Sequence, residues 1–261
     1  LRCFEDDDIT HVEGRIDPVA DAETVETELM LADLESLERR VTPLRKRAAN
    51  DKEAKAQVEL MDKVLELLRE GKPARLVAIE DADERRAFEM LNLLTAKPVL
   101  YVCNVDEASA ASGNALSDKV AEMAKAQGAG SVVISAAIEA EIAQLPPEEQ
   151  TEFLETLGLA EPGLDRLIRA GYELLGLITY FTVGPKETRA WTIERGTKAP
   201  QAAGVIHSDF ERGFIRAQTI AYDDYVTLGG EAGAKEAGKA RDEGKEYVVA
   251  DGDVLLFKFA T

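Results

Sequence analysis

The sequence predicts an α/β protein in which a parallel sheet is joined to a helical hairpin and to a small α+β module. Between residues 98 and 177, short apolar runs alternate with amphipathic stretches, which is the order of parallel strands connected by helices. Between residues 21 and 71, apolar side chains instead recur every three to four residues, as in paired helices. Short strand-like runs separated by turn residues fill the last third of the chain. We therefore expect three domains: residues 1–20 together with 72–177, residues 21–71, and residues 178–261.

The composition argues against two broad classes of function. The 261 residues carry a formal net charge of −19, and an acidic surface repels phosphate, so we expect no DNA partner and RNA contact only through a local basic patch. No apolar run approaches the roughly 18 residues that a membrane span needs. The two cysteines, Cys3 and Cys103, fall in apolar runs, which suits buried, reduced thiols. These features predict a cytoplasmic protein with no membrane partner.

The helical hairpin is predicted from two apolar stripes with steps of three and four residues. The stripes consist of Met30, Leu34, Leu37, Val41 and Leu44, and of Ala54, Val58, Met61, Leu65 and Leu68. Gly71 and Pro73 follow as stop signals, and Pro43 is expected to kink or locally break the first helix. A basic cluster near the hairpin tip indicates either a docking point for RNA or protein, or a solvated helix face. It consists of Arg39, Arg40, Arg45, Lys46, Arg47, Lys52 and Lys55.

The carboxyl-terminal third is predicted to hold five short strands, a helix between the second and third strands, and an Ala-rich helix after Gly229 and Gly230. The strands are expected at residues 178–183, 190–194, 214–220, 247–249 and 254–259, and the first of the two helices at residues 200–206. A module of about eighty residues is large enough to fold on its own.

Two buried strands end in polar segments at which a ligand site is expected. The apolar run at residues 99–103 leads into Asn104, and a second run leads into Ser135, Ala136 and Ala137. Open α/β sheets bind ligands at the carboxyl ends of their strands. An Asn amide offers one donor and one acceptor in a plane, which matches the edge of a purine, and small side chains let backbone amides approach the ring. These segments predict the base-recognition part of a nucleotide site.

Several segments resemble the YchF family of Obg-related P-loop NTPases, which includes the eukaryotic Obg-like ATPases. They are RCFEDDDITHVEG, DPVADAETVETELMLADLESLERR, KPVLYVCNVDE, SAAIEAEIAQL, LITYFTVGPKETRAWTIERGTKAPQAAGVIHSDFERGFIRAQTIAYDDYV and EGKEYVVADGDVLLFKF. The resemblance extends through nearly the whole chain. It implies that the parallel sheet belongs to a P-loop NTPase-type domain, that the hairpin is the inserted coiled coil of the family, and that the last module is its ubiquitin-like β-grasp domain, termed TGS.

The resemblance also assigns roles to the two strand ends. Most relatives of the small GTPases recognise guanine with an NKxD sequence, whereas the YchF family carries NxxE and prefers ATP. The matching positions are Asn104, Val105 and Glu107 in the first signature and Ser135, Ala136 and Ala137 in the second. Val105 lies where backbone contact with adenine is expected. Asp106 keeps a GTPase as an alternative, because a shift of this carboxylate into an acceptor role would restore guanine affinity.

The TGS domain implies contact with the ribosome or ribosomal RNA, so its basic residues are candidates for that contact. These candidates are Arg189, Arg195, Lys198, Arg212 and Arg216. Trp191, Phe210 and Phe214 are candidates for stacking on bases, and the alternative is core packing for the aromatic rings and solvated charge for the arginines. The hairpin is a second candidate surface, for protein partners.

Phosphoryl transfer in this class needs a Gly-rich loop ending in Gly-Lys-Ser/Thr, a Mg²⁺ ligand and a residue that positions water. We identify none of these in the 261 residues, and in the family they precede the strand with which this chain opens. We therefore expect an amino-terminal P-loop segment, with the Mg²⁺ ligands, to be lacking here, and we assign no catalytic or metal-binding residue. The expected function is a ribosome-associated ATPase that uses ATP and Mg²⁺ as the full-length protein, with this chain inactive alone. The alternatives are a GTPase, or an RNA- or ribosome-binding regulatory module in which hydrolysis is incidental.

Overall fold

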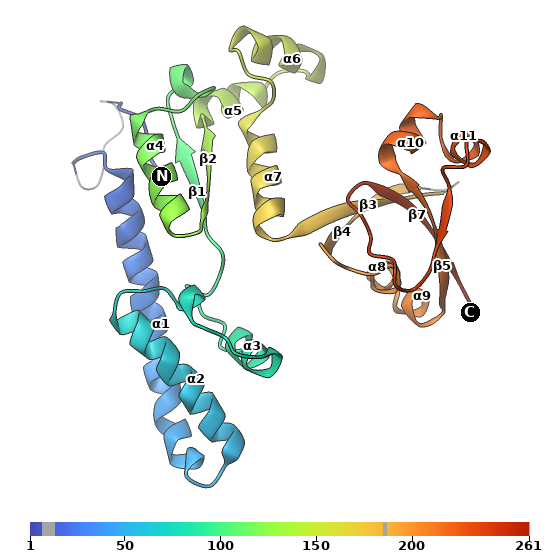
Figure 1. The fold of residues 1–261 in the computed structure, drawn as a ribbon. Coiled ribbons are helices and arrows are strands. Elements are labelled where there is room, and N and C mark those ends of the chain that lie inside the picture. Colours follow the sequence, from blue (N-terminus) through green and yellow to red (C-terminus); the bar gives the residue numbers. More distant parts are fainter. Residues whose placement is uncertain (7–13, 185–186, 261) are drawn as a thin grey trace. The chain divides into compact units, whose positions relative to one another are not determined.

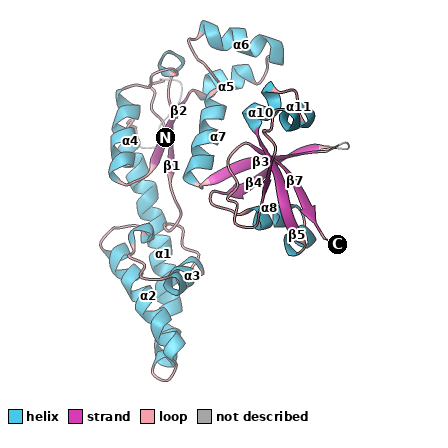
Figure 2. Ribbon diagram, turned by 45° about the vertical axis from the view of Figure 1, so that its right-hand side comes forward, coloured by secondary structure: helices cyan, strands magenta, loops and turns pink. Residues whose placement is uncertain are grey.

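The chain divides into two compact units, Leu1–Ala170 and Gly171–Thr261 (Figure 1). The computed structural model describes residues 1–6, 14–184 and 187–260. The first unit contains a two-stranded sheet among many helices, and the second contains a five-stranded sheet (Figure 2). Along the described residues, no helix is both long enough and apolar enough to cross a membrane.

The first unit follows the predicted alternation of helices and strands. Its described elements are α1 (Pro18–Ala48), α2 (Lys52–Arg69), the 3-10 helix η1 (Ala74–Leu76), α3 (Ala82–Glu89), β1 (Leu100–Asn104), the 3-10 helix η2 (Glu107–Ser109), α4 (Ala115–Ala126), β2 (Gly130–Ile134), α5 (Ala136–Ile142), α6 (Pro147–Thr156) and α7 (Gly163–Leu174), whose last turn belongs to the second unit.

β1 and β2 are parallel neighbours, as predicted, and the first residues of the chain lie along the other side of β1. Asn104 pairs with Ile134 on β2, and its carbonyl accepts a 2.7 Å hydrogen bond from the N–H of Cys3. Cys3 and Cys103 are both free and fully buried in the core that this sheet forms with α4. Because the strands are parallel, their carboxyl ends meet at one edge of the sheet. Asn104 therefore lies beside the segment that follows β2.

α1 and α2 pack side by side, and their apolar stripes form a second core (Figure 1). Each helix begins with an Asp cap: the side chain of Asp17 accepts from the N–H of Ala20, and that of Asp51 accepts from the N–H groups of Glu53 and Ala54. Fully buried side chains of this core include Leu37, Val64 and Leu65. The hairpin is thus stabilised by apolar packing along its length and by caps at the start of each helix.

α1 continues through Pro43, so the expected local break is wrong. Proline removes only the N–H that would bond to the carbonyl of Arg39. The hydroxyl of Thr42 donates to the carbonyl of Glu38 at 2.9 Å, and Val41 is buried against α2. We attribute the continuity to this packing, which outweighs one missing backbone hydrogen bond near the end of the helix.

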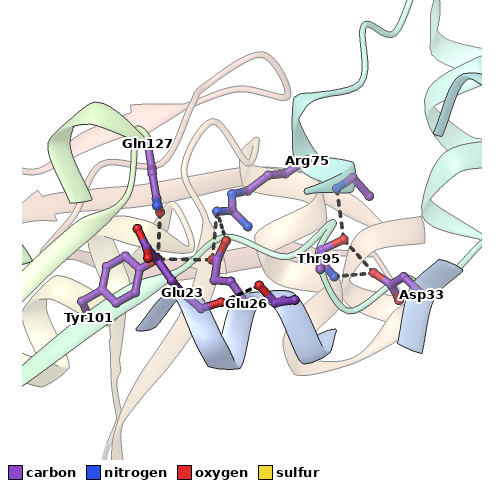
Figure 3. A network of polar contacts seen from close by, with 9 residues as sticks. Glu23, Glu26, Asp33, Arg75, Thr95, Tyr101 and Gln127 are labelled. Carbon is purple, nitrogen blue, oxygen red and sulfur yellow. Dashed lines mark hydrogen bonds and ion pairs between the residues drawn. The ribbon is translucent and has the colours of Figure 1, made fainter. Parts of the chain in front are cut away.

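A buried carboxylate joins α1 to the turn before β1 (Figure 3). Asp33 is 3% exposed and accepts hydrogen bonds from the N–H of Leu94 (2.8 Å), the N–H of Thr95 (2.8 Å) and the hydroxyl of Thr95 (2.7 Å). The Thr95 hydroxyl oxygen also accepts from the N–H of Ala74 at 3.0 Å. These donors satisfy a charge that would otherwise be costly to bury.

A second polar cluster joins α1 to β1 itself (Figure 3). Arg75 donates to both oxygens of Glu26, at 3.0 and 3.2 Å. The hydroxyl of Tyr101 lies 3.2 Å from Glu26 Oε1 and 2.8 Å from Gln127 Oε1, and it donates its single hydrogen to one of them at a time. Burial and the Glu26 carboxylate raise the pKa of Tyr101 to about 12, so this hydroxyl stays protonated at neutral pH. The cluster fixes the hairpin to the strand that ends at Asn104.

The second unit is built around a mixed sheet with the strand order β4-β3-β7-β5-β6. Its described elements are β3 (Leu177–Val183), β4 (Thr188–Glu194), α8 (Ala199–Ile206), α9 (Ser208–Arg212), β5 (Phe214–Ala221), α10 (Tyr222–Thr227), α11 (Glu231–Glu236), β6 (Arg241–Glu243) and β7 (Asp253–Phe259). β3 and β7 are parallel, and the other neighbouring strands are antiparallel. α8 completes the core on one face, where Tyr180 is fully buried and donates to the carbonyl of Ala202 at 2.9 Å.

One strand of this unit was predicted in the wrong place. Residues 247–249 form only an isolated bridge, between Val248 and Lys198. The hydroxyl of Tyr247 and the N–H of Ala250 both donate to the carboxylate of Asp253, at 2.7 and 2.9 Å, which holds this segment in a turn. The fifth strand is instead β6, whose Arg-Asp-Glu sequence has no apolar alternation because it lies at the sheet edge.

Candidate nucleotide-base site

Asn104, the last residue of β1, is oriented by the segment that follows β2. Its Oδ1 accepts a 2.9 Å hydrogen bond from the N–H of Ala136, the first residue of α5. Its backbone is held as well, because its N–H donates to the carbonyl of Leu1 at 2.9 Å. With the side-chain oxygen occupied, the amide NH₂ group remains available to a ligand. The strand end thus presents an oriented hydrogen-bond donor.

The next two residues are largely used by the fold. Val105 is 3% exposed, and its N–H donates to the carbonyl of Ile134 at 2.9 Å, so only its carbonyl remains to contact a base. Asp106 is the N-cap of η2, and its carboxylate accepts a 2.9 Å hydrogen bond from the N–H of Ser109. This hydrogen bond engages one carboxylate oxygen of Asp106 in a local turn and leaves the other oxygen available.

Glu107, by contrast, is exposed at the start of η2. Its carboxylate makes no hydrogen bond or ion pair with any residue that the structure describes. Among the four residues 104–107, Asn104 therefore offers its amide NH₂ to a ligand, Asp106 one carboxylate oxygen and Glu107 both.

The Ser135–Ala137 segment supplies the other side of the site. Ser135 is 2% exposed, and its hydroxyl has no hydrogen-bond partner among the described residues. Ser135 is not among the residues that line the cavity at these strand ends, so the structure does not bring its hydroxyl to the site. The N–H of Ala137 lies in the first turn of α5, where backbone donors have no acceptor within the helix. Both groups lie next to Ala136, which holds Asn104.

A cavity of about 560 Å³ lies at these strand ends. Its lining residues are Phe4, Glu5, Asp6, Asn104, Val105, Asp106, Glu107, Ala108, Ala136 and Ala137. The sequence analysis missed Phe4, Glu5 and Asp6, although their place directly after a predicted strand was a usable signal. The lining includes four carboxylates and no cation, so it suits the base of a nucleotide better than its phosphates.

The described residues contain no cluster of three or more metal-ligating side chains, from His, Cys, Asp or Glu, that is arranged to hold a metal ion. We therefore assign no step to a metal at this cavity.

The basic residues proposed for RNA contact are spread over the second unit. Arg189 is on the edge strand β4, with its guanidinium 4.1 Å from the ring centroid of Trp191, and Arg195 directly follows that strand. Arg216 is on β5, with β3 and β7 between. Lys198 is the residue before α8. The residues therefore do not form one compact patch.

Three of these five cations form ion pairs with described residues, and two do not. Lys198 pairs with Glu246 at 2.5 Å, Arg216 with Asp242 at 2.9 Å, and Arg212 with Asp209. Neither Arg189 nor Arg195 has a carboxylate partner among the described residues.

The three aromatic candidates of this unit are largely used in packing. Phe214 is 4% exposed and Phe210 stacks on Phe259 with ring centroids 3.9 Å apart. Trp191 is partly buried against the core, and its Nε1–H donates to the hydroxyl of Thr182 at 2.9 Å.

Much of the basic cluster on the hairpin is also paired. Arg45 contacts Asp62 at 2.5 Å, Arg47 contacts Asp51 at 3.3 Å, and Lys55 lies 3.9 Å from Glu59. Arg40 donates to the carbonyl of Leu91 at 2.8 Å. These contacts favour the solvated-face interpretation over an RNA-binding patch at the hairpin tip.

Comparison with known proteins identifies the family. A family model described as YchF-GTPase_C, a protein of unknown function (DUF933), matches residues 177–260. The ribosome-binding ATPase YchF of Haemophilus ducreyi is 55% identical over 260 residues, which cover 99% of this chain and 71% of that protein. The chain belongs to the YchF family. The ribosome-binding ATPase YchF of Bacillus subtilis is 53% identical with the same coverage, and the Obg-like ATPase 1 of Oryza sativa subsp. japonica is 41% identical over 99% of this chain and 66% of its own length.

Solved structures support the same assignment. The YchF GTPase of Schizosaccharomyces pombe matches with a TM-score of 0.83 and 36% identity over 98% of this chain and 70% of that one. A GTP-binding protein from Pyrococcus horikoshii OT3 matches with a TM-score of 0.58 at 18% identity, over 94% of this chain and 72% of its own, which shows likeness of fold alone. As a YchF member, the chain thus combines a parallel α/β sheet with a mixed carboxyl-terminal sheet.

Proposed function

We propose that this chain forms the base-recognition part of the nucleotide site in a ribosome-associated ATPase, and that it recognises adenine in preference to guanine. The observation that carries the proposal is the hydrogen bond from Ala136 to Asn104 Oδ1, which aims the Asn104 amide NH₂ at a ligand. A purine ring nitrogen accepts from such a donor. The cavity that contains Asn104 also contains the free carboxylate of Glu107.

The proposed preference for adenine rests on which carboxylate makes no hydrogen bond within the described residues. Guanine presents a ring N–H and an amino group side by side, and a short Asp carboxylate can accept from both. Asp106 is the candidate for that role, but the N–H of Ser109 holds one of its two carboxylate oxygens in the local turn, which disfavours a paired contact through both. Glu107 has a longer side chain and remains free to accept from the exocyclic amino group of adenine. The alternative of a GTPase is kept because the Schizosaccharomyces pombe relative is named a GTPase.

Hydrolysis is proposed for the full-length protein and not for this chain by itself. The 261 residues contain no Gly-Lys-Ser/Thr sequence, and the cavity is lined by carboxylates and no cation. ATP is accordingly expected to bind this chain no more tightly than adenosine does. Tight, Mg²⁺-dependent binding of ATP by this chain would contradict the proposal.

The domain roles are proposed on the same basis. Residues 1–20 with 72–177 would form part of the nucleotide-binding domain, residues 21–71 its inserted coiled-coil hairpin, and residues 178–261 a TGS domain of β-grasp type. The five-stranded mixed sheet crossed by α8 supports the last assignment. The names of the relatives support ribosome association, and hence a cytoplasmic protein. The hairpin is proposed to meet a protein partner.

Base selectivity gives the test of the proposed function. A double variant, Val105→Lys with Glu107→Asp, recreates the guanine-type signature, and it is expected to move the ratio of adenosine to guanosine affinity toward guanosine by about tenfold, the value of one charged hydrogen bond. Ligand-observed NMR titration of both nucleosides measures the ratio. Val105→Lys alone is the control, since it leaves Glu107 in place. An unchanged ratio in the double variant would remove Glu107 from base selection, and a preference of the unaltered chain for guanosine would favour the GTPase alternative.

Ribosome contact is expected to depend on the unpaired cations of the second unit. Changing both Arg189 and Arg195 to Glu should weaken co-sedimentation with ribosomes about tenfold or more, because two exposed positive charges become negative. Arg212→Glu alters a cation that Asp209 already pairs, so its effect should be smaller. Changing both Lys97 and Lys125 to Glu, at exposed positions of the first unit, is the matched control for net charge. Equal co-sedimentation of all variants would exclude this surface.

A further inference from the structure

A second cavity, larger than the one at the nucleotide-base site, lies along the helical hairpin. It has a volume of about 810 Å³ and lies between α2 and α3. Side chains at helical spacing line it from both sides: Glu53, Ala56, Gln57, Leu60 and Lys63 from α2, and Asp83, Arg86, Ala87 and Met90 from α3 and its end. We call it the hairpin groove.

The floor and one rim of the hairpin groove are apolar. Leu60, Met61 and Leu91 are buried at its base, with 3%, 5% and 7% of their surface exposed. Met90 is 80% exposed, more than any other large apolar side chain that the structure describes. Methionine is flexible and polarizable, and it is common at surfaces that bind amphipathic helices. This rim is therefore suited to an apolar side chain of a partner.

The walls of the hairpin groove are acidic. Six carboxylates line it, from Glu53, Glu59, Glu80, Asp81, Asp83 and Glu84, against three cations, from Arg40, Lys63 and Arg86. The cations are already engaged: Lys63 pairs with Glu84 at 2.8 Å and with Glu80 at 3.2 Å, Arg40 donates to the carbonyl of Leu91, and Arg86 lies 3.5 Å from Asp83. Glu53 has no cationic partner among the described residues. The groove thus retains negative charge around an apolar floor.

α3 is attached to the hairpin mainly at its edge. None of its residues is fully buried, and its partly buried Ala87 and Phe88 pack against the hairpin core. The ion pairs of Lys63 join α2 to α3 and to the residue before its cap. A helix held in this way can adjust its distance from α2 when a partner enters the groove.

We propose that the hairpin groove is a docking site for a cationic amphipathic segment of a protein partner, bound as a helix with apolar residues on the floor and Lys or Arg side chains against the walls. Charge complementarity selects this occupant, because the excess of carboxylates repels the phosphates of RNA and the apolar floor matches the apolar stripe of a helix. The inference rests on the proposal that the hairpin meets a protein partner, and it is independent of the nucleotide-base site.

The test is a binding titration of this chain with two synthetic peptides, followed by fluorescence anisotropy. The first peptide consists of Leu and Lys arranged with the period of an amphipathic helix, and the second is its scrambled isomer with equal charge. The first is expected to bind about tenfold or more tightly than the second, since only it can bury an apolar stripe. High salt should weaken the binding of both peptides, because it screens the charged walls of the groove. The difference in affinity between them should remain, because salt does not screen contact with the apolar floor.

Variants locate the binding. Met90→Lys should weaken binding of the amphipathic peptide about tenfold, by placing a cation at the apolar rim, whereas Leu31→Lys, an exposed apolar residue of α1 outside the groove, should not. The pair Glu53→Lys and Glu59→Lys should weaken it by at least as much, whereas Glu35→Lys, exposed on α1, should not. These positions are exposed, so the variants should fold normally.

Three outcomes overturn the proposal. They are equal binding of the two peptides, equal loss in the groove and control variants, and tighter binding of single-stranded RNA than of the amphipathic peptide. None of them bears on the proposed nucleotide function, because base selectivity is measured separately with Val105 and Glu107 variants.

Discussion

Replacing Asn104 by Ala is expected to weaken adenosine binding about thirtyfold, which corresponds to about 2 kcal/mol. The change removes the amide NH₂ that we propose contacts the base, and it leaves the N–H of Ala136 without its 2.9 Å acceptor. The second loss matters because Ala136 is the first residue of α5, so the segment that carries Ser135 and Ala137 loses its side-chain hydrogen bond to the end of β1. Ligand-observed NMR titration of adenosine measures the effect.

Two further variants separate the contributions. Asn104→Asp keeps an oxygen for the N–H of Ala136 but replaces the donor by a second acceptor, so it should bind adenosine as weakly as the Ala variant. Asn50→Ala makes the same chemical change at the exposed turn between α1 and α2, and it should leave affinity unchanged. If Asn104→Ala binds adenosine within twofold of the unaltered chain, the base-site assignment is wrong.

Replacing Asp33 by Ala is expected to lower the free energy of unfolding of the first unit by about 3 kcal/mol. Asp33 is 3% exposed and accepts three hydrogen bonds from Leu94 and Thr95. Alanine leaves these donors unpaired in a buried place and detaches α1 from the turn that leads to β1. The loss is measured as a shift in the midpoint of urea unfolding, followed by far-UV circular dichroism, with the m-value unchanged.

The second unit serves as an internal reference for this experiment. Its single tryptophan, Trp191, lies on β4 in the second unit, so tryptophan fluorescence follows the unfolding of that unit. The Asp33→Ala variant should shift the circular dichroism transition and leave the fluorescence transition nearly in place. Glu35→Ala, two residues along and exposed, should change neither by more than about 0.5 kcal/mol. A similar loss in both Asp33→Ala and Glu35→Ala would show that the buried hydrogen bonds of Asp33 are not the cause.

Elements with strong local patterns were predictable from the sequence. The two stripes of the hairpin and the apolar runs of β1 and β2 each bury one face or both, so their residues repeat with the period of the element. β6 was missed for the opposite reason. An edge strand of charged residues buries little, and its pairing with β5 comes from the sheet and not from its own sequence.

The candidate site shows the same division. The positions of Asn104 and Glu107 were predictable, because the resemblance to the YchF family and the ends of buried strands both indicate them. The sequence could not show which of their polar atoms already form hydrogen bonds within the fold. Asp106 and Glu107 are adjacent carboxylates with the same charge. Only the hydrogen bond from the N–H of Ser109 shows that the fold uses a carboxylate oxygen of Asp106 and none of Glu107.

The sequence by itself thus determined the family, the order of most elements and the two strand ends at which we propose a base site, since these depend on local periodicity and on residue identity. Only the tertiary structure decided the rest. It determined the direction of the Asn104 amide, the pairing of most basic residues with carboxylates, and the acidic groove between α2 and α3. Each of these depends on contacts between residues far apart in the chain, and such contacts leave no periodic trace in the sequence.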